Sequence, residues 1–315
     1  MTDVARAVLM VPPTGFDFNP ETADSNAFMH RPNVDVATLR STVRSEFDGV
    51  VDTLTSAGIR VIVLDDDPND PPPDAVFPNN WFSTHADGTI VLYPMESRQR
   101  RRERRRDALV RALTDAGCRI TSIHDLSPLE REGLFLEGTG SLVIDHANGT
   151  AFAARSSRMH DAALDAFREL RGIDVVAFDA VDARGVPIYH TNVMMSIGPS
   201  CAVVALDQIV DAQDRHRVAS TIEASGHEIV AITATQMQEF AGNVLTLRAD
   251  DGSDRLVLSQ RALDSLRTDQ IARLKAHATP LVVDVTTIEH IAGGGVRCML
   301  AEVFLPVDPP ATMPS

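Results

Sequence analysis

Three side chains that could act together in nucleophilic catalysis lie in short polar stretches of the sequence. Cys298 ends the stretch GGGVRC, His190 lies in YHTN, and Glu137 lies in LEGTG. A cysteine and a histidine, with a carboxylate to orient the histidine, supply a nucleophile, a base and an acid. Gly294 and Gly295 let backbone N–H groups approach a developing negative charge. If these stretches meet in space, the chain is expected to be a cysteine-dependent enzyme.

A repeating unit should bring these stretches together. In each unit an amphipathic segment ends in a small residue and an apolar strand follows. Gly58, Gly117, Gly172 and Gly226 mark four of the five units, at intervals of 54 to 59 residues. A fixed period of this size indicates a repeat architecture, in which matching positions lie near one axis. The polar stretch follows the apolar strand in every unit, so the five stretches should converge. Their further polar residues are Asn79, Asn80, Asn192 and Asn243.

Each unit is predicted to contain about three strands and one helix. The spacing of Leu39, Val43 and Phe47 predicts a helix that Gly58 would close. Further helices are expected at 105–117, 159–172, 210–226 and 260–276. The N-terminal segment ARAVLMVPP should pair with the C-terminal strand, which would close a ring without an exposed sheet edge. The predicted fold class is therefore α/β: a five-fold pseudo-symmetric α/β propeller in one closed domain over residues 1–315, with a short disordered tail at about 307–315.

The other cysteines provide a comparison for Cys298. Cys118 opens a strand beside Gly117, and Cys201 lies in the apolar run CAVVAL, so both are typical of core packing. Cys298 alone shares a register with His190. The sequence has no second histidine or cysteine near these residues at a spacing typical of metal ligands, and we expect neither a metal nor another cofactor.

Composition and charge narrow the class of protein. The 315 residues are 44% hydrophobic and contain no run of about 20 apolar residues, so a membrane span is not expected. The N-terminus shows no secretory signal, and three cysteines give no disulfide framework, which favours a reducing cytoplasm. A net charge of −15 repels phosphate backbones, so nucleic acid is not an expected partner. The oligomeric state stays open, a homo-oligomer included.

One basic run, SRQRRRERRR at 97–106, departs from this acidic character. A nucleic-acid or targeting segment is one interpretation. Aromatic residues do not interleave, however, and the run continues into the amphipathic sequence RDALVRALTDAG. A solvated helix face is therefore the favoured interpretation.

With these residues in hand, the chain resembles the pentein or amidinotransferase superfamily over nearly its whole length. The motifs that carry the resemblance are PDAVFPNNW, LEGTGSLVI, YHTNVMMS, GGGVRCMLAEVF and, at 19–28, NPETADSNAF. The resemblance implies a five-bladed α/β propeller that modifies guanidino or ureido groups. Within the superfamily the chain is most similar to the branch of citrulline ureidases, also called citrulline utilisation hydrolases. Arginine deiminase and dimethylargininase are related enzymes.

The resemblance also implies roles for individual residues. Cys298 matches the family nucleophile, His190 the general acid/base, and Glu137 the acid that contacts histidine and substrate. Asn80 and Asn192 fall where arginine deiminases have two aspartates.

Two arginines match residues that hold the substrate α-carboxylate in the deiminases. Arg100 corresponds to the first arginine of an R-R-x-E run, although its basic neighbours offer alternatives. Arg158 follows the third unit's S-x-R pattern but lacks the threonine that usually comes next.

The two replacements of aspartate by asparagine bear on the substrate. A guanidinium is cationic and pairs well with buried carboxylates. A ureido group is neutral, so two carboxylates around it would be uncompensated buried charges. Asparagine offers a donor and an acceptor without charge. Asn80 and Asn192 therefore favour a ureido substrate, although Glu137 alone could still hold a guanidinium.

The hypothesis from sequence is a cytoplasmic hydrolase that converts the amino acid citrulline into ornithine, ammonia and carbon dioxide. Cys298 would attack the ureido carbon, the glycine loop and the asparagines would bind its oxygen, and His190 would protonate the departing amine. The alternative is a guanidine hydrolase of the same fold, a dimethylargininase or an arginine deiminase. Less favoured are an amidinotransferase and a non-catalytic propeller that binds a protein partner.

Overall fold

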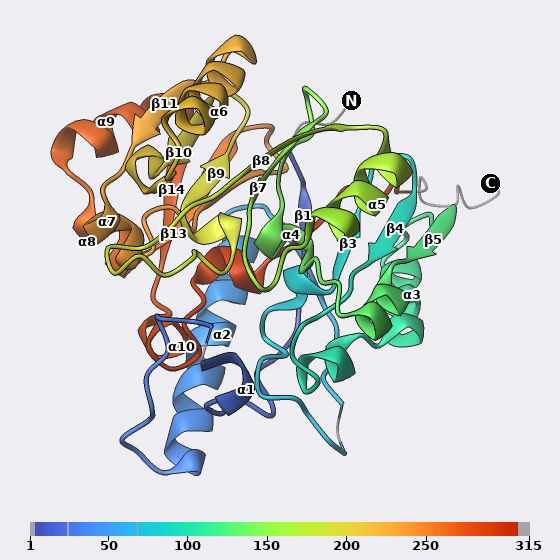
Figure 1. Ribbon diagram of the computed structural model, residues 1–315. Coiled ribbons are helices and arrows are strands. Elements are labelled where there is room, and N and C mark those ends of the chain that lie inside the picture. Colours follow the sequence, from blue (N-terminus) through green and yellow to red (C-terminus); the bar gives the residue numbers. More distant parts are fainter. Residues whose placement is uncertain (1–3, 24, 68, 308–315) are drawn as a thin grey trace, which may run out of the picture.

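The computed structural model describes residues 4–307 except residues 24 and 68, and its strands form five three-stranded sheets (Figure 1). In each sheet the middle strand is antiparallel to one neighbour and parallel to the other. The sheets comprise β15 (Ala301–Val303), β1 (Ala7–Met10) and β2 (Arg60–Val63); β3 (Phe82–Thr84), β4 (Thr89–Leu92) and β5 (Ser122–Asp125); β6 (Val143–Asp145), β7 (Thr150–Ala154) and β8 (Asp174–Phe178); β9 (Met195–Ile197), β10 (Cys201–Val204) and β11 (Glu228–Ala231); and β12 (Leu245–Arg248), β13 (Asp254–Ser259) and β14 (Thr279–Val283).

A helical crossover joins the middle strand of each sheet to its parallel neighbour, as a parallel pair requires. These helices lie around the periphery of the molecule (Figure 1). They are α2 (Val36–Ser56), α3 (Arg106–Asp115), α5 (Asp161–Arg171), α6 (Ala212–Ala224), and the pair α8 (Gln260–Ser265) and α9 (Thr268–His277). The repeating unit predicted from the sequence is therefore present in all five sheets.

Helix α2 illustrates how the local sequence sets these elements. Asp35 caps the helix by accepting a hydrogen bond from the backbone N–H of Thr38. Leu39, Val43 and Phe47 are buried on one face, as their spacing predicts. The chain then leaves the helix through Gly58, whose φ of +78° favours glycine.

The helix predicted over 260–276 is interrupted in the structure. Leu266 and Arg267 have extended backbone angles and separate α8 from α9. Ser259 caps α8 by accepting from Ala262, and Gln270 accepts from the backbone N–H of Arg267 at the start of α9. The two helices are therefore capped separately, which apolar periodicity alone does not reveal.

Short elements lie between the sheets and carry most of the polar stretches. The helices are α1 (Pro20–Ala23), α4 (Gly138–Ser141), α7 (Ala234–Gln238) and α10 (Thr286–Ala292), and the 3-10 turns are η1 (Pro78–Asn80), η2 (Arg100–Glu103), η3 (Ser127–Glu132), η4 (Thr191–Val193), η5 (Leu206–Gln208) and η6 (Val296–Met299). None of the helices in the described residues is long and apolar enough to cross a membrane.

The two ends of the described chain meet in one sheet. Strand β1 pairs antiparallel with β15, with Ala7 opposite Val303, so the predicted pairing of the N-terminal and C-terminal strands is confirmed. Leu9 and Ala301 of this sheet pack with Trp81 and Leu92 of the next one. The tail predicted at about 307–315 lies, beyond Val307, outside the described residues.

A buried carboxylate on α10 leads to a prediction about stability. Glu289 is fully buried, and neither of its carboxylate oxygens has a hydrogen-bond partner among the described residues. Burial raises the pKa of Glu289 to about 7. Because this pKa is above the value in the unfolded chain, the folded state holds the proton more tightly. Stability should therefore fall as pH rises from about 4.5 to about 7, by about 3 kcal/mol, and then level off.

The variant Glu289→Gln should lose this part of the pH dependence. Thermal unfolding measured from pH 5 to pH 8 would show a shallower decline in Tm than in the native protein. Glu223→Gln, at an exposed position of α6, is the matched control. If the native and Glu289→Gln curves run parallel, Glu289 is not the titrating group.

Candidate active site

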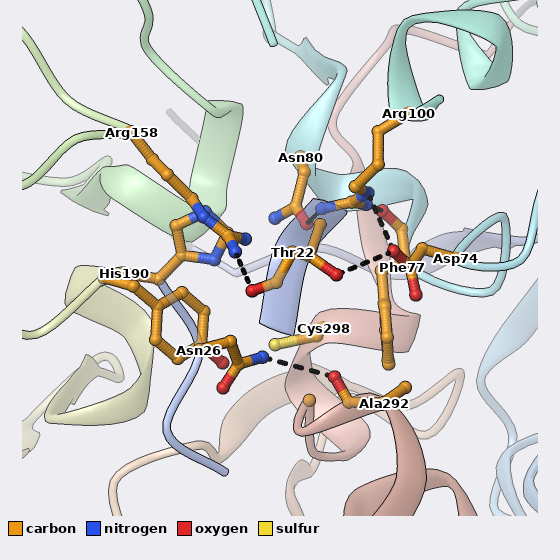
Figure 2. A pocket seen from close by; sticks show the side chains of 12 residues that line it. Thr22, Asn26, Asp74, Phe77, Asn80, Arg100, Arg158, His190, Ala292 and Cys298 are labelled. Atoms are coloured by element: carbon orange, nitrogen blue, oxygen red, sulfur yellow. Dashed lines mark hydrogen bonds and ion pairs between the residues drawn. The ribbon is translucent and has the colours of Figure 1, made fainter. Parts of the chain in front are cut away.

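Two of the three predicted catalytic residues, Cys298 and His190, line one pocket (Figure 2), and Glu137 is hydrogen-bonded to His190. Cys298 lies on η6, while His190 immediately precedes η4 and Glu137 immediately precedes α4. Each of these turns is followed by the first strand of a sheet, so all three residues lie at the same end of their strands. The pocket is lined by Thr22, Asn26, Asp74, Phe77, Asn80, Arg100, Arg158, Tyr189, His190, Ala292, Gly294 and Cys298.

Glu137 and His190 form a buried pair behind the pocket. Oε2 of Glu137 lies 2.8 Å from Nε2 of His190, and the same oxygen is 3.6 Å from Arg158 and 3.7 Å from Arg100. Burial alone would raise the pKa of Glu137, but Arg158, the hydrogen bond to His190 and Arg100 together hold it well below its usual range. Burial lowers the pKa of His190 to about 4, against the opposing effect of Glu137. At neutral pH, His190 is therefore uncharged and able to accept a proton.

Two amides surround the thiol of Cys298. Nδ2 of Asn243 lies 3.3 Å from Sγ, and Nδ2 of Asn192 lies 3.6 Å from it. The backbone N–H of Arg297 donates to Oδ1 of Asn243, which turns the NH2 group of that amide toward the sulfur. Burial raises the pKa of Cys298, and the hydrogen bond from Asn243 partly offsets the increase. The resting group is a thiol, and the amides favour its conversion to thiolate.

The orientation of Asn80 is fixed by Arg100. Nη1 of Arg100 donates to Oδ1 of Asn80 at 2.8 Å, while Nε and Nη2 bind the two carboxylate oxygens of Glu103 at 2.9 and 3.0 Å. The Nδ2 group of Asn80 therefore faces the other way, where it donates to Asn79. A Cβ atom on Gly140 would come within 2.4 Å of this Nδ2 and 2.8 Å of the ring of His190. Asn80 thus presents its N–H donors on the side of the histidine.

The glycine loop before Cys298 has free donors. The backbone N–H groups of Gly294 and Gly295 form no hydrogen bond to another described residue. Gly294 lines the pocket, whereas Gly295 packs behind it, against Asn243 and Phe240. A Cβ atom on Gly294 would lie 2.7 Å from the ring of Phe77, so the loop can approach the site only with glycine there.

A segment near the N-terminus covers the pocket; we call its described residues, 19–23 and 25–29, the cover segment. Thr22 lines the pocket together with Cys298, and in Figure 2 it lies between the side chains of Arg158 and Arg100. Arg158 donates to the carbonyl of Thr22 and to Oγ of Ser25, and Asn26 donates to the carbonyl of Ala292. With the segment in this position the cavity encloses only about 20 Å³, which is room for one water molecule.

The basic run does not form a uniformly solvated helix face, and that interpretation of the sequence was wrong for part of it. Arg100 is only 2% exposed and points into the pocket. Arg104 pairs with Glu130 at 2.7 Å, while Arg102 remains on the surface. Burial of Arg100 is possible because Glu103, three residues later, supplies a partner for its charge.

Asp74 is a pocket residue that the sequence analysis missed. Its side chain is buried, Oδ2 accepts from Asn19 at 2.7 Å, and Oδ1 has no partner among the described residues. Burial raises the pKa of Asp74, while the nearby Arg100 lowers it. The sequence feature that could have revealed Asp74 is its position directly before the apolar residues AVF. The prolines that precede Asp74 make the segment resemble a surface loop, so this feature was overlooked. Asn79, in contrast, was a predicted site residue but lies behind Asn80, outside the pocket lining.

Solved structures with the same fold come from enzymes of arginine metabolism. ArgZ, an arginine dihydrolase of the ornithine-ammonia cycle in cyanobacteria, gives a TM-score of 0.73 at 16% identity over 96% of this chain. The match covers 41% of that protein, so the chain spans less than half of its length. The N-terminal domain of ArgZ bound to substrate gives 0.71 at 16% identity and covers 95% of this chain and 99% of that one.

A third structure is an adduct of dimethylarginine dimethylaminohydrolase with S-methyl-L-thiocitrulline. It gives a TM-score of 0.65 at 13% identity and covers 95% of this chain and 99% of that one. A comparison with curated proteins finds no match. A family model described as N,N dimethylarginine dimethylhydrolase, eukaryotic, matches residues 12–305. The resemblance seen in the sequence is confirmed: the chain belongs to this family, within the pentein superfamily.

Proposed function

We propose that the protein is a citrulline ureidase, which hydrolyses citrulline to ornithine, ammonia and carbon dioxide. The observation that carries this proposal is the set of side-chain amides around the nucleophile and its base. Asn192 and Asn243 donate toward Sγ of Cys298, and Asn80 presents its NH2 group on the side of His190. Amide donors match the carbonyl oxygen of a ureido group and add no negative charge beside it.

The surroundings of Glu137, the carboxylate beside His190, support the same substrate. Glu137 already faces His190, Arg158 and Arg100, so its charge is largely compensated before a substrate binds. A guanidinium beside Glu137 would lie close to two other cations, Arg158 and Arg100, which disfavours its charge there. Asp74 offers a different contact, because its unpaired Oδ1 suits the α-ammonium group of an amino acid.

The chemistry proposed for this site has two stages. In the first, Cys298 transfers its proton to His190, and Sγ bonds to the ureido carbon. The amides and the free N–H of Gly294 stabilise the oxyanion, and His190 protonates the departing nitrogen of ornithine. In the second, His190 takes a proton from water, which attacks the S-carbamoyl group. The C–S bond breaks, the thiol is restored, and the released carbamate decomposes to ammonia and carbon dioxide.

Substrate entry requires the cover segment to move. A cavity of about 20 Å³ cannot hold an amino acid, and both arginines are bound to protein groups in the closed arrangement. Movement of the cover segment would release Arg158 from Thr22 and Ser25. The freed guanidinium would then be available to the substrate α-carboxylate.

A second candidate is hydrolysis of a guanidino group, which the family match favours. Arginine and dimethylarginine are the substrates to consider, and Glu137 is the residue that would face their charge. Purified protein should therefore be offered citrulline, arginine and asymmetric dimethylarginine separately. Ornithine and ammonia from citrulline, with no product from the other two, is the expected result. Citrulline formed from either guanidino compound would replace the proposed substrate and keep the nucleophile.

Asn80→Asp is expected to lower kcat/KM for citrulline by about tenfold to a hundredfold, because a donor to the ureido oxygen is replaced by a carboxylate. Steady-state kinetics would measure this effect, with Asn33→Asp at an exposed position as the control. Equal kcat/KM for Asn80→Asp and the native protein would show that Asn80 does not contribute to the selection of citrulline.

We also propose that the five sheets are blades of one closed propeller. The common topology of the sheets and the pairing of β15 with β1 support this arrangement. Matching positions then lie around a central axis, which accounts for the meeting of Cys298, His190 and Glu137. A non-catalytic binding role is less well supported, because it gives no reason for these three side chains to be held together.

A further inference from the structure

A second, larger cavity lies at the far end of the strands that carry the site; we call it the distal cavity. Strands β3, β6 and β15 follow Asn80, Glu137 and Cys298 along the chain, and at their other ends stand His85, His146 and Phe304. The cavity has a volume of about 530 Å³, within the range of small-molecule sites. It is lined by His85, Ala86, Asp87, Ile144, Asp145, His146, Gly149, Arg171, Gly172, Ile173 and Phe304.

The distal cavity combines an apolar wall with unused imidazole nitrogens. The ring of His146 packs on Phe304 with centroids 4.1 Å apart, and the ring of His85 lies 6.2 Å from that of His146. Nε2 of His85 is hydrogen-bonded to Oγ of Ser83. Nδ1 of His85 and both ring nitrogens of His146 form no hydrogen bond to another described residue. None of these three nitrogens is a fully buried atom, so they can be reached by a molecule in the cavity.

Arg171 supplies a charge at the same cavity. One of its nitrogens, Nη1, pairs at 3.0 Å with Asp87, whose side chain is 55% exposed. Nε and Nη2 of Arg171 have no hydrogen-bond partner among the described residues. The second carboxylate of the lining, Asp145, is engaged by the backbone and side-chain amides of Asn148. Arg171 therefore retains free donors, with the two imidazoles and the apolar wall in the same cavity.

We propose that the distal cavity binds a small organic carboxylate with an apolar body. The carboxylate would be held by Arg171 and by an N–H of His146, and the hydrocarbon part would contact Phe304, Ile144 and Ile173. Burial and the charge of Arg171 both lower the pKa of His85, to about 3, and the pKa of His146 is also lowered, chiefly by burial. Both rings are therefore neutral, and each carries one N–H donor. An anion bound beside them would favour their charged forms and raise both pKa values.

Calorimetry with butyrate, norvaline and butylamine would test this proposal and distinguish a plain carboxylate from an amino acid. Butyrate or norvaline should bind and butylamine should not. Arg171→Gln should weaken binding at least tenfold, and Arg168→Gln, on the same helix, should leave it unchanged. His146→Phe, which keeps the packing on Phe304, should also weaken binding. NMR titration of the histidine C2 protons should show the pKa of His146 rising when the carboxylate is present.

Two results would contradict a carboxylate site in the distal cavity. If neither carboxylate binds at millimolar concentration, or if binding is the same in Arg171→Gln as in the native protein, the distal cavity is not a carboxylate site. Binding that survives Arg171→Gln would have to come from another place, including the pocket of Cys298. The proposal is independent of the substrate of that pocket.

Discussion

Replacing Cys298 with alanine is expected to abolish hydrolysis, with turnover reduced by a factor on the order of 10⁴ or more. The sulfur is the nucleophile that the site offers to a ureido or guanidino carbon, and the amides of Asn243 and Asn192 are arranged to stabilise its anion. A neighbouring water cannot replace a covalent step at comparable rate. Ammonia release measured with purified protein would show the effect.

The other cysteines are natural controls for this experiment. Cys118 and Cys201 are buried in the core, and Cys201→Ala should retain turnover within a few-fold of the native value. Because burial raises the pKa of Cys298, its alkylation by iodoacetamide should accelerate only at pH values above those at which an ordinary thiol ionises, and substrate should slow it. Turnover retained by Cys298→Ala would rule out the covalent scheme.

His190→Gln is expected to lower kcat by about 10³-fold, which is typical of the loss of a general acid–base group. Glutamine can still donate a hydrogen bond to Glu137, so the buried carboxylate keeps a partner, but it cannot accept and return a proton. His216→Gln, at an exposed position of α6, is the control and should have no effect.

The pH profile provides a second measure of the role of His190. Its pKa is lowered to about 4, so the neutral form that accepts a proton predominates above that value. The acid limb of kcat/KM should therefore fall only as pH drops through about 4, well below the usual range of histidine. An acid limb near pH 6.5 would show that His190 is not held neutral by its surroundings.

The sequence predicted the repeating architecture because each unit has its own periodic signal. Gly58, Gly117, Gly172 and Gly226 all have positive φ angles at the ends of helices, and the strands that follow them lie where the pattern placed them. The break in the helix over 260–276 was missed because apolar spacing continues across it. Only the capping contacts of Ser259 and Gln270 reveal the break.

The sequence was sufficient to predict which residues meet at the site, but not how their side chains are oriented. Cys298, His190 and Glu137 could be grouped because they occupy equivalent positions in three units. The direction of the Asn80 amide depends on Arg100, 20 residues away, and the position of Arg100 depends on Glu103. The cover segment depends on contacts such as that between Asn26 and Ala292, which are 266 residues apart. Pairings at such separations leave no local pattern in a single sequence.

Because β1 pairs with β15, the catalytic thiol is the last of the three catalytic groups to take its place. Cys298 lies on η6, directly before β15, and β15 completes a sheet whose other two strands come from the first 63 residues. During synthesis, Glu137 and His190 leave the ribosome long before the thiol does. The nascent chain therefore contains its base and acid before it contains its nucleophile, and we expect attack on a substrate to begin only after β15 has paired with β1. Appearance of activity should thus report the pairing of β15 with β1, later than the formation of most secondary structure in the preceding sheets.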